Sequence, residues 1–366
     1  MFVRSNFLLA LFLIVVLGAA LRVTQPLRMI ESSSWDENPI QAKLRALSQL
    51  AGDPSFIILG SSLSMSANAL ADDRWQNGEH PLDRPEYNTH AQTLFLDHEL
   101  SELTRKKVAG IDLSCEACMP GDAVNITRYV FDRGKKTGAL IYCVGSRDFL
   151  DGRTQNRYDL FMLAPQVTVR ELLQHDFQTD AERLYGDLSH LYRVRWDFKR
   201  VAIAAVQAMR FPSEHRNVFA TYPLLNAPMT HGRLRRDLAG YKRVYSTANT
   251  LKENAQWQTF HELCALCRQH GTALYVVNMP LTPAHKERLL SGMYEEYRRK
   301  LSTACAQENV ALIDIDREQT LKMSDFFDSV HLNGAGGMKT ISYLARRLAE
   351  LESRRPICDS CCPTLH

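Results

Sequence analysis

The stretch Phe56-Ile57-Ile58-Leu59-Gly60-Ser61-Ser62 decides the fold that we expect for this chain. Four consecutive apolar residues are followed by a glycine and two serines. A short apolar run that ends in a turn is typical of a strand buried on both faces of a parallel sheet. The stretch therefore predicts the first strand of an α/β domain, with Ser62 where the strand gives way to a helix.

The same pattern recurs along the chain, with helical stretches between the apolar runs. The further runs are 108–113, 139–144, 273–277 and 311–315. Their alternation with helices predicts a doubly wound α/β fold with a mostly parallel, five-stranded sheet in flavodoxin-like order. Residues 151–255 are rich in Arg, Tyr, His and Phe and show no clear buried strand. We expect a helical insertion there, either an elaborated crossover or a cap over the site.

The N-terminal residues differ from the rest of the chain. Residues 7–21 read FLLALFLIVVLGAAL and follow Arg4. This length lies between a signal-peptide core and a spanning helix. We expect residues 1–22 to be an uncleaved signal anchor; a cleaved signal peptide and a buried N-terminal helix are the alternatives. Residues 23–50 then form a tether and a helix, 51–350 the main domain, and 351–366 a cysteine-rich tail.

Composition excludes few classes of function. The chain has 366 residues, and its net charge of +3 is close to neutral for this length. The basic clusters at 106–107, 135–136 and 233–236 are short and scattered, so we interpret them as solvated helix surface and expect no nucleic-acid partner.

Nine cysteines include three C-x-x-C pairs. The pairs are Cys115/Cys118, Cys264/Cys267 and Cys358/Cys361. They lie far apart in the sequence, which favours packed thiols or disulfides over a zinc site.

Small or polar residues follow every predicted strand. The clusters are 60–64, 114–122, 145–149, 278–280 and, after the fifth strand, 328–333. In a doubly wound sheet, ligands bind outside the carboxyl ends of the strands. We therefore expect an active site at this edge.

Ser62, Asp328 and His331 fit nucleophilic catalysis. A serine hydroxyl needs a base to take its proton, and the base needs a carboxylate to fix its tautomer. Asp328 and His331 are three residues apart, so both can face one side of a turn. Taken alone, Ser62 is better explained as a helix cap, and the order and placement of Ser62, Asp328 and His331 favour catalysis.

These residues resemble the SGNH/GDSL hydrolase superfamily. Gly60-Ser61-Ser62 is similar to its first block, with Ser61 in place of Asp, and Asp328-Ser329-Val330-His331 is similar to its last. The Gly-Ser-Ser form looks like the membrane-anchored branch that includes D-alanyl-lipoteichoic-acid transfer and alginate O-acetylation proteins. The resemblance covers roughly residues 50–350. It implies Ser62, His331 and Asp328 as the catalytic residues.

The resemblance also implies an oxyanion site, with one departure. Gly121 takes the place of the second block's glycine. Arg147 stands where the third block has Asn, and its guanidinium either takes over as donor or forms a structural ion pair. Asn278 either lines the site or makes an Asx-type turn before Met279-Pro280.

We therefore expect an exported, serine-dependent ester hydrolase or acyltransferase that acts on a cell-surface polymer or glycan, in the bacterial cell envelope or secreted if the signal is cleaved. The expected partners are an envelope polysaccharide or acylated small molecule, a membrane-bound O-acyltransferase, and the membrane through the N-terminal helix. The reaction needs no metal or organic cofactor. The alternative is a catalytically weak protein that binds an envelope glycan or assists an O-acyltransferase. A metal-dependent phosphoesterase is disfavoured, since no carboxylate/His cluster has ligand spacing.

Overall fold

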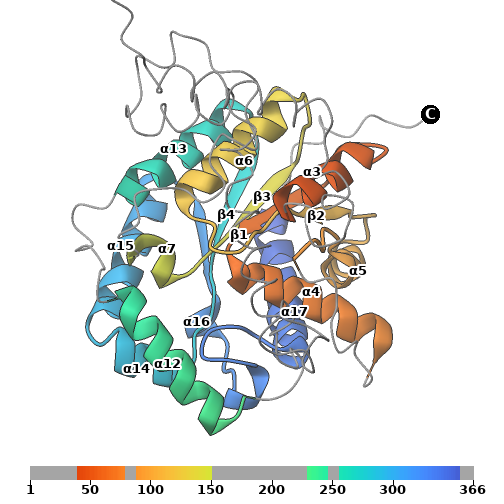
Figure 1. Ribbon diagram of the computed structural model, residues 1–366. Coiled ribbons are helices and arrows are strands. Elements are labelled where there is room, and N and C mark those ends of the chain that lie inside the picture. Colours follow the sequence, from red (N-terminus) through yellow and green to blue (C-terminus); the bar gives the residue numbers. More distant parts are fainter. Residues whose placement is uncertain (1–38, 79–87, 151–228, 246–254, 355–366) are drawn as a thin grey trace, which may run out of the picture. The chain divides into compact units, whose positions relative to one another are not determined.

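Figure 1 shows the computed structural model, which describes residues 39–78, 88–150, 229–245 and 255–354. The N-terminal apolar stretch, most of the expected insertion and the cysteine-rich tail lie outside these residues, so the predictions made for them stay predictions. The described part of the insertion is helix α12 (His231–Tyr245). Within the described ranges, no helix combines the length and apolarity that crossing a bilayer requires.

Five parallel strands form one sheet in the order β2-β1-β3-β4-β5. The strands are β1 (Phe56–Gly60), β2 (Gly110–Asp112), β3 (Ala139–Val144), β4 (Ala273–Asn278) and β5 (Ala311–Asp314). Every residue of β1 and β3 is buried, as the continuous apolar runs predicted. The α/β fold and its strand order are confirmed, although β2 is shorter than the expected run 108–113.

The register of the sheet fixes where the site can lie. Gly60 pairs with Cys143, Val144 with Asn278, and Asn278 with Asp314. The last residues of β1, β3, β4 and β5 therefore stand side by side at one edge. Polar residues that follow these strands are brought together there, because parallel strands all end at the same edge.

Two groups of helices cover the sheet, which lies between them (Figure 1). One group is α4 (Ser62–Asn77), α5 (Leu94–Thr104) and α17 (Gly334–Arg354). The other is α6 (Pro120–Asp132), α7 (Ser146–Leu150), α13 (Ala255–Gln269) and α15 (Met293–Gln307). The remaining described elements are α3 (Pro39–Gln49), α14 (Pro283–Leu289), α16 (Ile315–Glu318) and the 3₁₀ helix η2 (Met323–Asp325).

Helix α3, which lies in the segment 23–50 where the sequence predicted a tether and a helix, is fastened to β2 by a buried lysine. Lys43 Nζ lies 3.3 Å from Asp112 Oδ2 and donates to the carbonyl of Ser114 at 2.7 Å. Neither Lys43 nor Asp112 is exposed. A buried ammonium group requires such partners, so this pair fixes the start of the described chain to the sheet.

The cysteines of two C-x-x-C pairs are packed thiols. Cys115, Cys118, Cys264 and Cys267 are all free and buried. The third pair lies outside the described residues. For the first two pairs the sequence left packed thiols and disulfides as alternatives, and the structure has packed thiols.

Candidate active site

Ser62 is the first residue of α4 and is separated from β1 by Ser61 alone. Gly60 has a φ of 155°, and a Cβ at this position would lie 2.5 Å from the carbonyl oxygen of Cys143. Only glycine fits this turn. The chain therefore bends sharply from the sheet into α4. Ser62 lies in the first helical turn, where the positive end of the helix dipole is found.

Ser62, His331 and Asp328 lie in one line. Ser62 Oγ is 2.7 Å from His331 Nε2, and His331 Nδ1 is 2.7 Å from Asp328 Oδ2. Because the carboxylate accepts the proton on Nδ1, Nε2 of the neutral ring is left to accept the Ser62 hydroxyl proton. This is the arrangement in which histidine serves as general base to a serine nucleophile.

Asp328 is held as a carboxylate by the turn that also carries His331. Its Oδ1 accepts the backbone N–H groups of Val330 at 2.9 Å and His331 at 2.7 Å. Burial acts to raise the pKa of Asp328, but the charge and hydrogen bond of His331, together with these N–H groups, lower the pKa below its ordinary value. The spacing of three residues thus lets one tight turn orient both groups.

The His331 ring is supported from a third side by Phe327. The two rings stack with centroids 5.4 Å apart and planes 10° apart. The Phe327 N–H also donates to the His331 carbonyl at 3.0 Å. Arg233 of α12 lies 5.1 Å from the Phe327 ring centroid. The stack on Phe327 limits rotation of the imidazole, which keeps its nitrogens on Ser62 and Asp328.

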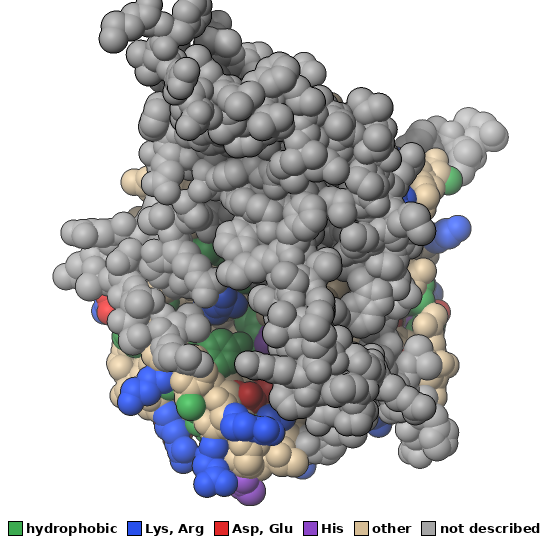
Figure 2. Space-filling model, viewed as in Figure 1, with side chains coloured by type: hydrophobic (Ala, Val, Ile, Leu, Met, Phe, Trp, Pro, Cys, Tyr) green, Lys and Arg blue, Asp and Glu red, His purple; other side chains and the backbone are tan. Residues whose placement is uncertain are grey.

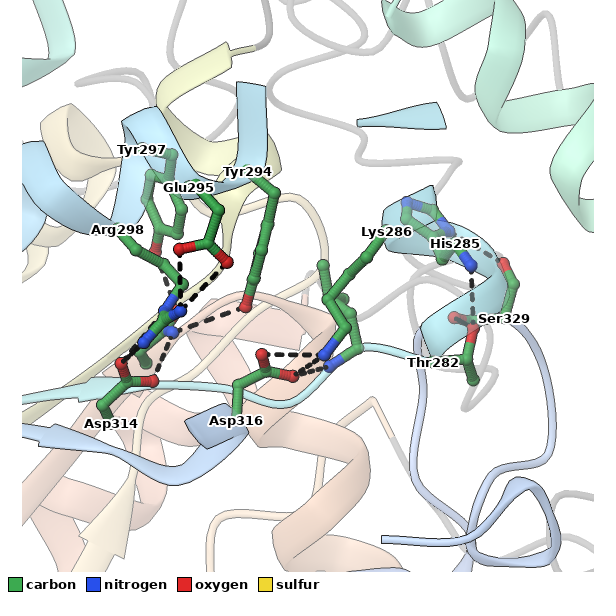
Figure 3. Close-up of polar contacts among 12 residues, drawn as sticks. Thr282, His285, Lys286, Tyr294, Glu295, Tyr297, Arg298, Asp314, Asp316 and Ser329 are labelled. Atoms are coloured by element: carbon green, nitrogen blue, oxygen red, sulfur yellow. Dashed lines mark hydrogen bonds and ion pairs between the residues drawn. The ribbon is translucent and has the colours of Figure 1, made fainter. Parts of the chain in front are cut away.

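His285 ties the Asp328–His331 turn to α14 and α12. Figure 3 shows His285 and Thr282 on either side of Ser329. His285 Nδ1 is 3.2 Å from Ser329 Oγ, and Thr282 Oγ1 donates to the Ser329 carbonyl at 2.7 Å. His285 Nε2 is 3.2 Å from the Tyr245 hydroxyl. Burial lowers the pKa of His285 to about 4, so this ring is neutral at physiological pH.

A pocket opens at Ser62. It encloses about 310 Å³ of space outside the protein atoms, part of it open to solvent. Its lining residues are Ser61, Ser62, Leu63, Gly145, Ser146, Arg147, Asp148, Tyr241, Tyr245, Leu281 and Val330. Five segments that are distant in the sequence therefore meet at this pocket.

The turn after β3 forms the wall of the pocket nearest to α4. A Cβ on Gly145 would lie 2.6 Å from Leu63 Cδ1, so the glycine permits close approach of the two segments. The Gly145 N–H donates to Asp148 Oδ2 at 2.8 Å, which orders the turn. Arg147 lines the pocket from here and is half-buried.

Ser146 has an unusual environment in this turn. Its side chain is buried, the residue is 1% exposed, and its hydroxyl has no hydrogen-bond partner in the described structure. Buried polar atoms are nearly always paired, and exceptions often mark binding or catalytic sites. Because Ser146 also lines the Ser62 pocket, its hydroxyl is a candidate to contact a substrate oxygen.

Gly121 is not among the residues that line the Ser62 pocket. Gly121 is the second residue of α6, and its N–H faces the Gln256 side-chain oxygen at 3.4 Å. The loop that follows β2 runs on for seven residues before α6 begins, and α6 packs against α13. The predicted oxyanion role of Gly121 therefore stays a prediction.

Asn278 is also outside the pocket. It is 1% exposed, and its amide donates to Asp314 at 2.8 Å and accepts from the Tyr297 hydroxyl at 3.0 Å. Figure 3 shows Asp314 bound as well by Arg298, beside Tyr294 and Tyr297. The polar groups at the end of β4 are thus used within the protein, and neither predicted alternative, site lining nor Asx turn, describes them.

Sequence reasoning missed several residues around Ser62. Tyr241 and Tyr245 come from the insertion, where only the aromatic composition was a signal. Ser146 follows a strand and was passed over for its neighbour Arg147. His285 lies on α14, just after the β4 strand end, and a search of the residues that follow Asn278 would have found it.

No protein-family model matches the sequence, and no curated protein matches it either. Solved structures with a similar arrangement include a lipase/acylhydrolase from Enterococcus faecalis (10% identity, TM-score 0.38, 81% of this chain and 96% of that chain). A GDSL-like lipase from Bacteroides thetaiotaomicron has 8% identity and a TM-score of 0.37, over 86% of this chain and 99% of that chain. A carbohydrate acetylesterase from Sinorhizobium meliloti has 11% identity and a TM-score of 0.35, over 82% and 100%. Likenesses this distant do not identify a reaction, so the proposed function rests on the geometry of the site.

Proposed function

We propose that this protein is an exported serine enzyme that hydrolyses or transfers an acyl ester on a cell-surface polymer or glycan, with Ser62 as its nucleophile. The observation that carries the proposal is the line of short contacts from Ser62 Oγ through His331 to Asp328, which ends in a pocket. A serine that served only as a helix cap would have no need of an oriented imidazole and carboxylate.

The reaction begins when Ser62 Oγ attacks the carbonyl carbon of the ester and His331 Nε2 takes the hydroxyl proton. Asp328 stabilises the imidazolium that forms. The tetrahedral intermediate then expels the alcohol, which receives the proton from His331. The acyl group remains on Ser62. Water or a sugar hydroxyl then attacks this acyl-enzyme and gives its proton to His331. The second tetrahedral intermediate expels Ser62 Oγ, which takes the proton from His331 as the acyl product is released.

The negative oxygen of the intermediate needs donors that are in place before the reaction. The first turn of α4 supplies backbone N–H groups and the positive end of the helix dipole next to Ser62. The turn after β3 adds Ser146 and Arg147, both in the pocket wall. A guanidinium and a hydroxyl here would take over from the Asn of the resembling superfamily.

Export is the part of the proposal that rests on the N-terminal residues 7–21. An uncharged apolar stretch behind a single arginine is typical of a signal sequence or anchor. A fusion of residues 1–50 to a reporter that is active only outside the cytoplasm should be active. A stable but silent fusion would contradict export without touching the proposed chemistry.

A fluorophosphonate probe tests the nucleophile directly. We expect covalent labelling of the full chain, mapped by peptide mass spectrometry to Ser62, and complete loss of labelling in Ser62→Ala. Ser64→Ala is the matched control, because the Ser64 hydroxyl is buried and bonds Ser61 and Ser114 instead. Absence of labelling in the wild-type protein, with no activity on ester substrates, would favour a catalytically weak protein that binds an envelope glycan or assists an O-acyltransferase.

A further inference from the structure

Positive charge is concentrated on two helices that border the pocket. Helices α12 and α14 together contain seven Lys and Arg residues against two carboxylates, a net charge of +5, whereas the whole chain has a net charge of +3. In Figure 2 the side chains at the lower edge of the face are mostly Lys and Arg, where Figure 1 places α12 and α14. The remainder of the chain is therefore slightly acidic.

These helices form one wall of the site. Tyr241 and Tyr245 of α12 line the pocket, and both rings pack edge-on against His285 of α14. Leu281, which precedes α14, also lines the pocket. A ligand that enters the pocket over this wall must pass the charged outer surface of both helices.

Two of the basic side chains are neutralised within the wall. Lys286 binds Asp316 at 2.9 Å, and Arg233 lies 3.9 Å from Asp237. These pairs hold the wall together. They leave its outer surface to the other basic residues.

Of the other five basic residues, four have side chains that the structure describes, and we call these four the basic rim: Arg235, Arg236, Lys242 and Arg288. All four are exposed, and within the described residues none of them forms an ion pair. The one exposed carboxylate on these two helices is that of Glu287. Unpaired like charges held on one surface favour binding of a polyanion, because each would gain a partner on contact.

The rim lacks the apolar side chains with which a surface helix enters a bilayer. The large apolar residues of α12 that are described, Leu234 and Leu238, are buried against the protein. Among the described residues, the exposed large apolar side chains are Leu50, Trp75, Leu103 and Met323, none of them on α12 or α14. Interfacial helices combine a basic face with an exposed apolar face, so a water-soluble polyanion fits this surface better than a membrane.

We propose that the basic rim binds an acidic polysaccharide and guides it along α12 to the Ser62 pocket. Its carboxylates contact the four cations, and an ester or hydroxyl of the chain then reaches Ser62. This second part rests on the proposed function, whereas binding itself does not. Since the rim is exposed, the interaction is electrostatic and weakens as salt screens it beyond about 8–10 Å.

The test measures binding of fluorescein-labelled polygalacturonate to the full chain in neutral detergent by fluorescence anisotropy. We expect binding that weakens steeply with salt, and no binding of neutral dextran of the same length. The double variant Arg235→Glu/Arg236→Glu should weaken binding by about tenfold or more, and Arg235→Gln/Arg236→Gln by less. Circular dichroism checks that each variant is folded.

The matched control is Lys106→Glu/Lys107→Glu. This pair is also adjacent and exposed, its reversal changes the net charge equally, and it precedes β2 at the opposite edge of the sheet. We expect less than a twofold effect on binding. An equal loss of binding in Arg235→Glu/Arg236→Glu and in this control would overturn the proposal, since binding would then depend on the net charge and not on the basic rim.

Two further measurements distinguish binding of a polymer from binding of a membrane, and failure of the basic rim from failure of the proposed catalysis. Vesicles of phosphatidylglycerol that bind the protein through Arg235 and Arg236, while polygalacturonate does not, would overturn the proposal in favour of a lipid surface. Saturating polygalacturonate should also slow fluorophosphonate labelling of Ser62. Labelling that is absent throughout would count against the proposed function alone, whereas labelling without polymer binding would count against the rim alone.

Discussion

Two polar clusters stand at the same edge of the sheet and use their hydrogen bonds in opposite ways. At the end of β4, Asn278 bonds Asp314 and Tyr297 and is closed to solvent. At the end of β1, Ser62 bonds His331 while its residue lines an open pocket. Both clusters follow buried strands and look alike in the sequence. The comparison teaches that a polar strand end becomes a candidate site only where its groups face a cavity.

The largest effect should come from the cluster that faces the pocket, Ser62, His331 and Asp328, which we call the open cluster. Ser62→Ala should lower kcat on an acyl ester by about 10⁴-fold or more, because the nucleophile is removed. The free energy of unfolding should change by less than about 0.5 kcal/mol, since Ser62 is only half-buried. Ester kinetics and urea unfolding measure the two quantities. Activity retained in Ser62→Ala would place the nucleophile elsewhere.

The second-largest loss of kcat is expected from a change at Asp328, the carboxylate of the open cluster. Asp328→Asn should lower kcat by about 10³- to 10⁴-fold, because an amide no longer fixes the proton on His331 Nδ1. The variant is compared with wild type by steady-state kinetics. A loss smaller than tenfold would show that the turn and the Phe327 stack orient His331 without the carboxylate.

The buried cluster of Asn278, Asp314 and Tyr297, which we call the closed cluster, should affect the free energy of unfolding and not the turnover. Asn278→Ala should lower the free energy of unfolding by about 3 kcal/mol, because Asp314 and Tyr297 lose a buried partner. Turnover of the folded protein should remain within about threefold of wild type. Asn77→Ala, at the exposed end of α4, is the control and should cost under about 1 kcal/mol. A large kcat loss at Asn278 would move this cluster into the active site.

Buried His285, which contacts Ser329 between Asp328 and His331, should make the free energy of unfolding depend on pH. Its pKa of about 4 lies below the ordinary value near 6.5, so the unfolded chain takes up the proton first as the pH falls. Its contribution to stability is therefore complete above about pH 6.5 and declines between pH 6.5 and 4. From pH 7 to pH 5 this group should cost about 2 kcal/mol.

Urea unfolding of wild type and His285→Asn at both pH values measures this contribution. The variant should lose less stability on acidification than wild type. Identical pH dependence in wild type and His285→Asn would show that the buried ring does not titrate as its burial requires.

The smallest effect is expected at Ser146, which lines the Ser62 pocket and whose hydroxyl has no hydrogen-bond partner among the described residues. Ser146→Ala should raise the free energy of unfolding by about 1 kcal/mol, since an unpaired buried hydroxyl is removed. It should also lower kcat/KM by about tenfold, if the hydroxyl contacts a substrate oxygen in the reaction. A stabilised variant with unchanged kcat/KM would leave Arg147 and the first turn of α4 as the donors.

The sequence by itself determined the alternation of strands and helices, because each element bears the periodicity of its own burial. It also determined Ser62 at the glycine turn after β1 and the Asp328–His331 turn, since both depend on residues at most three apart. Their catalytic role remains our proposal.

Only the tertiary structure decided which polar groups face the pocket. Gly121 and Asn278 follow strands as Ser62 does, yet their partners Gln256, Asp314 and Tyr297 come from distant segments. The basic residues that looked scattered in the sequence likewise meet on α12 and α14 beside that pocket. Local pattern specifies elements, whereas hydrogen-bond partners and charge density depend on contacts between elements, and no local pattern contains those.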